Sequence, residues 1–145
     1  MKRLILSIAF AAGIAATGTP AFAQQSGNLR VEFQGPGGHS SGAYGRVSAL
    51  HAAARAVILI QKALPAGSYV ITNLTGGNSV NSIASDGLVE LRLNAANAAA
   101  YQTLVAAVTK AAAEGAAAEN AFRGVKAGDL TSGAPATVRS VVKPF

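Results

Sequence analysis

The chain switches between two hydrophobic periods, and this switching limits the folds open to it more than any other feature. Apolar and polar side chains alternate through residues 28–34, which predicts a half-buried strand that ends in a glycine-rich turn. The apolar spacing then becomes helical over residues 44–64, and Pro65 and Gly67 end that segment. The residues expected on the buried side of this helix are Val47, Leu50, Ala54, Val57, Ile58 and Leu64.

Two further stretches return to alternation. Residues 68–74 are rich in β-branched and aromatic side chains, and residues 88–93 alternate aliphatic with charged side chains. Both are predicted strands, and the polar loop 76–87 separates them.

A second helix is predicted after the third strand. Asn94 is its expected N-cap, alanine dominates its length, and Gly115 lies near its expected end. Residues 121–127 are a candidate fourth strand, whereas residues 129–145 form a tail that we leave unassigned. The order strand, helix, strand, strand, helix, strand predicts an α+β fold, a ferredoxin-like βαββαβ sandwich with a four-stranded antiparallel sheet and both helices on one face.

The first 23 residues have the pattern of a cleavable signal peptide. Lys2 and Arg3 precede an apolar run at 4–16, and Ala21-Phe22-Ala23 offers the small-x-small site that a signal peptidase recognises. The run is shorter than the roughly 20 residues that span a bilayer, so a membrane anchor is the less favoured alternative. We therefore predict cleavage after Ala23, a periplasmic or secreted location, and no membrane attachment afterwards.

The part that remains after cleavage has the size of one domain, predicted at 24–128. Removing 23 of the 145 residues leaves 122, which suffices for one core but not for two. Without Lys2 and Arg3, ten basic and six acidic side chains remain, a net charge of +4. The basic residues are scattered and not interleaved with aromatic ones, which disfavours nucleic-acid binding. The absence of cysteine excludes disulfides and thiolate metal sites.

Two glycine-rich loops carry the most specific sequence signal. They are GPGGHSSGAYG at 35–45 and GGNSVNSIASDG at 76–87, and each alone indicates only a loop dense in hydrogen-bond donors. Followed by Glu90 and Arg92, they resemble the dimerisation (lid) domain of the di-zinc metallopeptidase family that includes acetylornithine deacetylase, succinyl-diaminopimelate desuccinylase, glutamate carboxypeptidase and tripeptidases. The resemblance covers roughly 28–115. The matching loop residues are Gly37, Gly38, His39, Ser40, Gly76, Gly77, Asn81 and Ile83.

The resemblance implies a substrate-binding role for four residues, His39, Ser40, Asn81 and Arg92. In the family the lid reaches toward the partner subunit's zinc centre, where the His polarises the scissile carbonyl and the Arg holds a substrate carboxylate. The structural alternative is that His39 caps its loop, Asn81 satisfies its own turn and Arg92 is a solvated strand residue.

The chain lacks the residues that the family's chemistry requires. Two zinc ions need His and carboxylate ligands, yet the chain has two His and six acidic residues, without a short-spaced His-x-Asp or an adjacent Glu pair. Ser40 and Ser41 beside His39 lack the strand-turn-helix setting of a catalytic serine. We therefore predict no catalytic residue, no metal and no cofactor, and no peptidase activity by the chain alone. His51 is expected at the surface or facing a partner.

The resemblance favours an exported dimerisation module that pairs with a second copy or with the lid of a full-length metallopeptidase. The residues expected at this interface are Arg55, Leu59, Lys62, Tyr69, Ile71 and Asn73. The alternative is a carboxylate- or peptide-binding module that uses the loops Gly35–Gly45 and Gly76–Gly87 together with Arg92.

Overall fold

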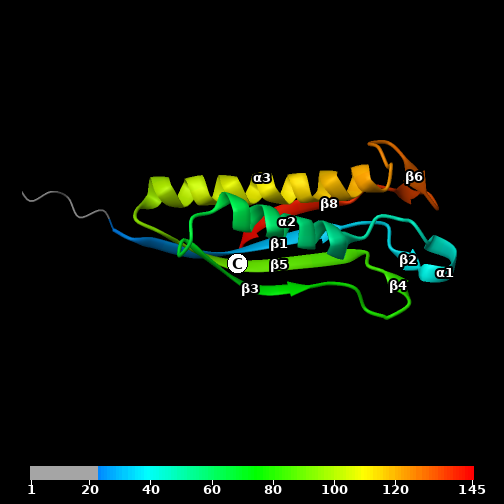
Figure 1. Ribbon diagram of the computed structural model, residues 1–145, viewed down its shortest axis with the longest axis horizontal. Coiled ribbons are helices and arrows are strands. Elements are labelled where there is room, and N and C mark those ends of the chain that lie inside the picture. The colour runs from blue at the N-terminus through cyan, green and yellow to red at the C-terminus, as the bar shows by residue number, and fades with distance from the viewer. Residues whose placement is uncertain (1–22) are drawn as a thin grey trace, which may run out of the picture.

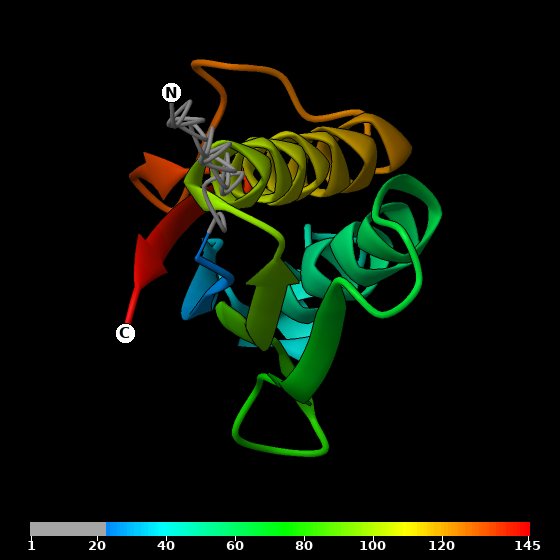
Figure 2. The same cartoon turned by 90° about the vertical axis from the view of Figure 1, so that its left-hand side faces the viewer.

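The computed structural model describes residues 23–145, so the predicted signal peptide lies outside the described residues except for its last. The main elements are β1 Gln25–Gln34, α2 Ala49–Ala63, β3 Tyr69–Thr75, β5 Asp86–Ala95, α3 Ala98–Phe122 and β8 Arg139–Pro144. The four strands form one antiparallel sheet in the order β3-β5-β1-β8. Both helices cover the same face of this sheet (Figures 1 and 2). The predicted βαββαβ sandwich is therefore confirmed.

Short elements gather at one end of the sandwich. β2 (Gly38–His39) pairs with β4 (Ser82–Ile83), α1 (Ser40–Ala43) follows β2 directly, and β6 (Leu130–Thr131) pairs with β7 (Ala134–Pro135). Across residues 23–145, no helix combines the length and the apolar character needed to cross a membrane.

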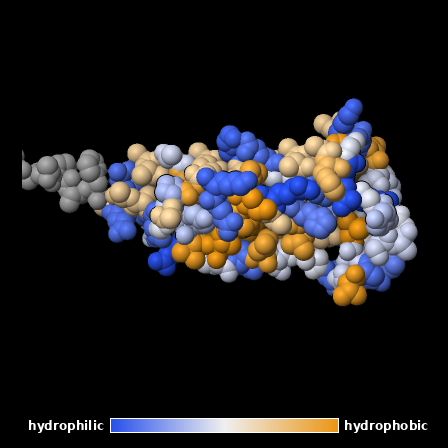
Figure 3. Space-filling model, in the orientation of Figure 1, coloured by the Kyte–Doolittle hydropathy of each residue, from blue (hydrophilic) through white to orange (hydrophobic). Residues whose placement is uncertain are grey.

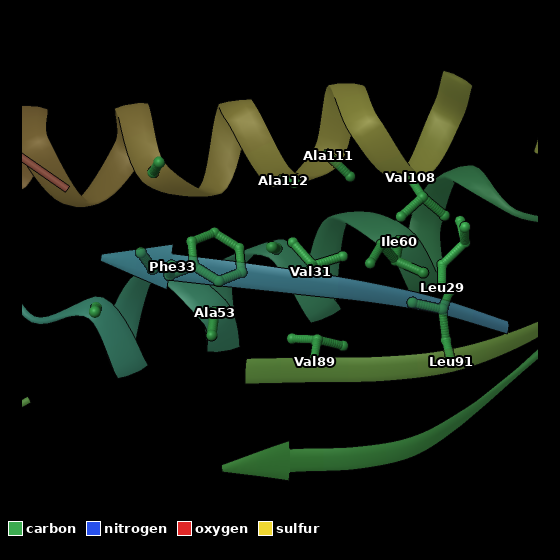
Figure 4. Packing of buried hydrophobic residues seen from close by; sticks show 14 of the residues in the cluster. Leu29, Val31, Phe33, Ala53, Ile60, Val89, Leu91, Val108, Ala111 and Ala112 are labelled. Carbon is green, nitrogen blue, oxygen red and sulfur yellow. The ribbon is translucent and has the colours of Figure 1, made fainter. Parts of the chain in front are cut away.

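The core lies between the sheet and the two helices. Leu29, Val31 and Phe33 point up from β1, and Val89 and Leu91 from β5, into the layer below the helices (Figure 4). All five are at most 3% exposed. On β1 and β5 the alternate residues, on the opposite face of the sheet, are mostly polar, which is the pattern expected of a sheet with one covered face.

The first long helix starts later than its apolar spacing predicts. Gly45 has a φ of +89°, which a helix does not permit, and Ser48 caps the helix by accepting a hydrogen bond from the backbone of His51 at 3.4 Å. The predicted buried side was only partly right: Val47 and Leu64 are buried, whereas Ile58 is 51% exposed. The fully buried stripe instead consists of Ala49, Ala52, Ala53, Ala56 and Ile60.

The alanine stripe is buried because the two helices approach each other closely. Gly115 lies inside α3, which continues to Phe122, so the helix ends later than predicted. A methyl group there would come within 2.7 Å of the backbone nitrogen of Ala56 and 2.8 Å of the carbonyl oxygen of Ala52. Small residues on both helices thus permit backbone contact, and larger side chains are turned outward.

The predicted cap of the second helix was wrong. Asn94 still belongs to β5, where its backbone N–H donates to the carbonyl of Ser68 at 2.8 Å. Asn97 caps α3 instead, and its side chain accepts from the backbone of Ala100 at 2.9 Å. Both asparagines suit an N-cap, and the pairing of β5 with its neighbours decides between them.

The predicted fourth strand was also wrong. α3 continues to Phe122, so most of residues 121–127 form its end and the turn after it. The fourth strand is β8, which pairs with β1 from Leu29↔Pro144 to Gln34↔Arg139. The residues 129–145 that the sequence left unassigned therefore complete the sheet.

β3 departs from strict alternation. The register with β5 shifts between Ile71 and Asn73, which leaves Thr72 as an extra residue. Ile71 faces the core, whereas Asn73 turns to the outer face and donates to Oε2 of Glu90 at 3.4 Å. The two residues do not share a face, contrary to the sequence pattern.

Candidate functional site

The two glycine-rich loops meet at one end of the sandwich. The β2–β4 pairing brings His39 next to Asn81, whose Nδ2 lies 3.1 Å from His39 Nε2. The backbone N–H of Ser40 donates to the carbonyl of Asn81 at 2.9 Å. Three of the four predicted substrate-binding residues are thus neighbours, although Asn81 lies 42 positions after His39 in sequence.

Local hydrogen bonds orient the imidazole of His39. Its Nδ1 accepts from the backbone N–H of Ser41 at 3.3 Å and lies 2.8 Å from the Ser41 hydroxyl, so His39 is the N-cap of α1. His39 therefore caps its loop, as the structural alternative predicted. The side chains of His39 and Asn81 remain exposed, and their contact with a substrate stays a prediction.

Arg92 lies apart from this cluster. In the sheet it is in register with Asn28 on β1 and Val70 on β3, toward the end of β5 that is remote from the two loops. It is exposed on the outer face of the sheet. Glu90, two positions earlier, is bound by Arg30, whose Nε and Nη2 donate to Oε1 at 3.1 and 2.7 Å. A ligand held by His39 and Asn81 therefore does not also reach Arg92 within one chain.

The predicted interface residues of α2 lie on the side of the helix that faces α3. Arg55 donates to a carboxylate of α3, and Leu59 and Lys62 line the groove between the two helices. Tyr69 and Ile71 of β3 are partly buried against the core. These residues do not form one continuous surface within the chain, and the interface itself stays a prediction.

A buried carboxylate that sequence reasoning missed joins the two helices. Glu119 of α3 is 0% exposed. Its Oε1 accepts from the backbone N–H of Ser48 at 3.2 Å and from Arg123 Nε at 3.3 Å, and its Oε2 accepts from Arg55 Nε at 3.1 Å. His51 Nδ1 lies 3.7 Å from Oε1. The only signal in the sequence is the spacing of four between Glu119 and Arg123 on an alanine-rich helix.

An aromatic ring completes the cluster around this carboxylate. The guanidinium carbons of Arg55 and Arg123 each lie 5.0 Å from the centre of the Phe122 ring. Phe122, predicted to lie in a strand, is 66% exposed and positions two cations instead of filling the core.

The sequence model of the family described as the peptidase dimerisation domain matches residues 24–120. The chain belongs to this family. The family resemblance predicted from the two glycine-rich loops is thereby confirmed.

Solved structures show the same fold for this dimerisation domain. An aminobenzoyl-glutamate utilization protein from Klebsiella pneumoniae is 18% identical with a TM-score of 0.61, and the match covers 88% of this chain and 32% of that one. A tripeptidase from Staphylococcus aureus is 17% identical with a TM-score of 0.60, covering 83% and 29%. A hydantoinase/carbamoylase family amidase from Burkholderia ambifaria is 20% identical with a TM-score of 0.60, covering 86% and 28%. No curated protein sequence matches the chain.

The dimerisation domain thus spans less than a third of each of these relatives. Within residues 23–145, no three His, Asp or Glu side chains come together in a way that could hold a metal ion. The described residues therefore do not fit a pair of zinc ions, and the absence of hydrolysis by the chain alone stays a prediction.

Proposed function

We propose that the mature chain is an exported pairing module that forms a two-fold homodimer through β3. The observation that carries this proposal is the position of β3 at the edge of the sheet, where it pairs with β5 on one side only. An edge strand offers a row of backbone donors and acceptors to another strand. Antiparallel pairing of β3 with its symmetry copy would join the two sheets into one and satisfy both edges.

The neighbouring side of α2 suits the same interface. Because Arg55 and Lys62 face α3, the flank of α2 above β3 carries no charged residue. Its members follow the helical repeat and are Leu50, Ala54, Val57, Ile58 and Gln61. On β3, Leu74 is 43% exposed on the side of α2, since it is in register with the core residue Val89, whereas Val70, in register with Arg92, is 56% exposed on the outer face. Figure 3 shows apolar side chains gathered over α2 and β3.

This surface replaces part of the interface expected from sequence. A partner that approaches β3 meets the uncharged flank of α2 before it can reach Leu59 or Lys62, which lie on the opposite flank. Charged residues are depleted at the centre of protein interfaces, which favours the uncharged flank. The backbone of β3, rather than the side chains of Tyr69 and Ile71, would supply the pairing.

The pairing is tested by placing a lysine on the proposed surface. We expect the mature protein to be a dimer at tens of micromolar and Ile58→Lys to raise its dissociation constant about a hundredfold, since two-fold symmetry doubles a cost of about 1.4 kcal/mol. Size-exclusion chromatography with light scattering over a dilution series measures the change. Val80→Lys is the matched control, because Val80 is fully exposed on the loop before β4 and lies outside the proposed surface. A monomeric parent protein contradicts the proposal.

Export, and the choice between a second copy and a longer partner, are tested together. We expect native mass spectrometry of the assembly recovered from the cell envelope to show a subunit that begins at Gln24 and a mass of two such subunits. One subunit bound to a full-length metallopeptidase would instead favour pairing with the lid of that enzyme. A subunit that retains residues 1–23 contradicts cleavage. Zinc-dependent peptide hydrolysis by the purified chain would contradict a purely non-hydrolytic role.

A further inference from the structure

Cleavage after Ala23 would place a glutamine at the N-terminus of the exported chain. Gln24 would become the first residue, and Gln25 follows it. Gln24 is exposed and precedes β1, whose first residue, Gln25, is in register with Ala95 of β5. The new terminus therefore lies outside the sheet, but only one residue away from it.

No linker separates this terminus from a strand on which the fold depends. β1 is a central strand, between β5 and β8, and Gln25 and Ser26 form its first two pairs with β5. Gly27 comes next and lies against the ring of Tyr101, so that a methyl group on this glycine would collide with the tyrosine hydroxyl. Stepwise loss of residues from the N-terminus would thus reach the centre of the sheet almost at once.

An N-terminal glutamine carries both groups of an intramolecular reaction. Its uncharged α-amine can attack the side-chain carbonyl carbon Cδ, which forms a new C–N bond and closes a five-membered lactam. The bond from Cδ to Nε2 then breaks, and this nitrogen leaves as ammonia with a proton taken from the α-amine. The reaction needs no oxidant, cofactor or second molecule, and having both groups in one residue raises their effective concentration.

The surroundings of Gln24 leave its amine available. The neighbouring residues on the two strands, Ser26, Asn94 and Ala95, carry no charge, so none of them holds the amine as an ammonium ion. An α-amino group has an ordinary pKa near 8, so on the order of a tenth of it is uncharged at pH 7. Because Gln24 lies outside the ladder, closing the ring breaks no pair between β1 and β5.

We propose that Gln24 of the exported chain is converted to a pyroglutamyl ring, and that this ring protects β1 from aminopeptidases. The lactam removes the charge of the terminus, as acetylation does, and aminopeptidases bind that charge. The proposal rests on the cleavage after Ala23 that the proposed function includes. It does not depend on pairing through β3.

The first test is the intact mass of the full-length chain after expression and recovery from the cell envelope. We expect the mass of residues 24–145 less one ammonia. The matched control is Gln24→Asn, whose amide is one methylene shorter, so that ring closure would need a strained four-membered lactam and the ammonia should be retained. A mass that includes residues 1–23 contradicts the cleavage. The full mass of residues 24–145, unchanged on prolonged incubation at neutral pH, contradicts the ring alone.

A second sample removes the dependence on native cleavage. A fusion partner takes the place of residues 1–23 and is cut off by a protease immediately before Gln24, and the intact mass is then followed with time. We expect the parent chain to lose one ammonia in a first-order process whose rate does not change with protein concentration, because the reaction is intramolecular. Loss of ammonia at the same rate from Gln24→Asn would place the reaction at another amide and overturn the assignment.

Digestion with a broad-specificity aminopeptidase measures the protection. We expect the cyclised chain to be trimmed at least about tenfold more slowly than Gln24→Asn, because the peptidase loses a charge-assisted hydrogen bond to the α-ammonium group. The two chains should have the same melting temperature, since residue 24 lies outside the ladder. Equal trimming of both chains would show that the pairing of β1, and not the ring, protects the terminus.

Discussion

A mature chain that ends after Gly128 is expected not to fold. The deletion removes β8, so β1 loses its partner from Leu29 to Gln34 and becomes an edge strand. It also removes Val138, which is 3% exposed in the core. The backbone of Val138 is held on both sides by Asn120, which donates to its carbonyl at 2.9 Å and accepts from its N–H at 2.7 Å.

The expected loss is comparable to the whole stability of the domain. Removing six ladder positions, a buried valine and both hydrogen bonds of a part-buried amide should cost more than about 5 kcal/mol, the lower end of the stability of domains of this size. Circular dichroism and urea denaturation of residues 24–128 should show no cooperative transition.

The matched control is a chain that ends after Lys143. It keeps most of β8 and loses Pro144 and Phe145, whose ring lies 4.7 Å from the Arg30 guanidinium carbon and is 53% exposed. Its cost should be about 1 kcal/mol, the scale of an exposed cation–π contact. A cooperative transition of residues 24–128 near that of the control would show that β8 is not part of the folding unit.

The contrast between the strands shows what the sequence could predict. Residues 28–34 and 88–93 alternate between apolar and polar side chains because helices cover one face of the sheet. This alternation is enough to predict both strands. β8 contains only two apolar residues, Val141 and Val142, and one of them is 57% exposed. Its place depends on backbone pairing with β1, which leaves little trace in its side chains. The end of α3 did leave a signal, because Gly124 follows it with a φ of +68°, which a helix does not permit; the prediction chose Gly115 instead.

The candidate site, too, could be predicted only in part from the sequence. The neighbourhood of His39 and Asn81 could be expected because both belong to glycine-rich loops whose order matches a family. Arg92 was grouped with them by sequence order alone, and the length of β5 separates it from the loops. The role of Glu119 could not be predicted from the sequence. The four groups that surround its carboxylate come from two helices and a turn, and they meet only after the helices pack.

Replacing Glu119 by alanine is expected to produce the largest loss of stability among single substitutions outside the apolar core. Among residues 23–145, this carboxylate is the only one within hydrogen-bonding distance of Arg55 and Arg123, and it also accepts from the buried start of α2. Removing one partner of a buried ion pair costs about 3–5 kcal/mol, because the remaining charges and the N–H lose their compensation. The side chains of Arg55 and Arg123 are 37% and 25% exposed, so water can reach them, and we expect a loss near the lower value, about 3 kcal/mol.

Urea denaturation of Glu119→Ala measures this loss, and two variants separate its causes. Glu119→Gln keeps the shape and an oxygen that can accept from Ser48, so its own cost measures the loss of the charge. A cost about half as large as that of Glu119→Ala would assign the other half to the lost shape and the lost hydrogen bond with Ser48. Glu114→Ala removes a carboxylate from the same helix that is 49% exposed and paired only with Lys110, and its cost should stay below about 0.5 kcal/mol. Equal effects of Glu114→Ala and Glu119→Ala would mean that Glu119 is solvated in solution and that the contact of α2 with α3 rests on the alanine stripe and Gly115. The position of Arg123 would then lack its anchor.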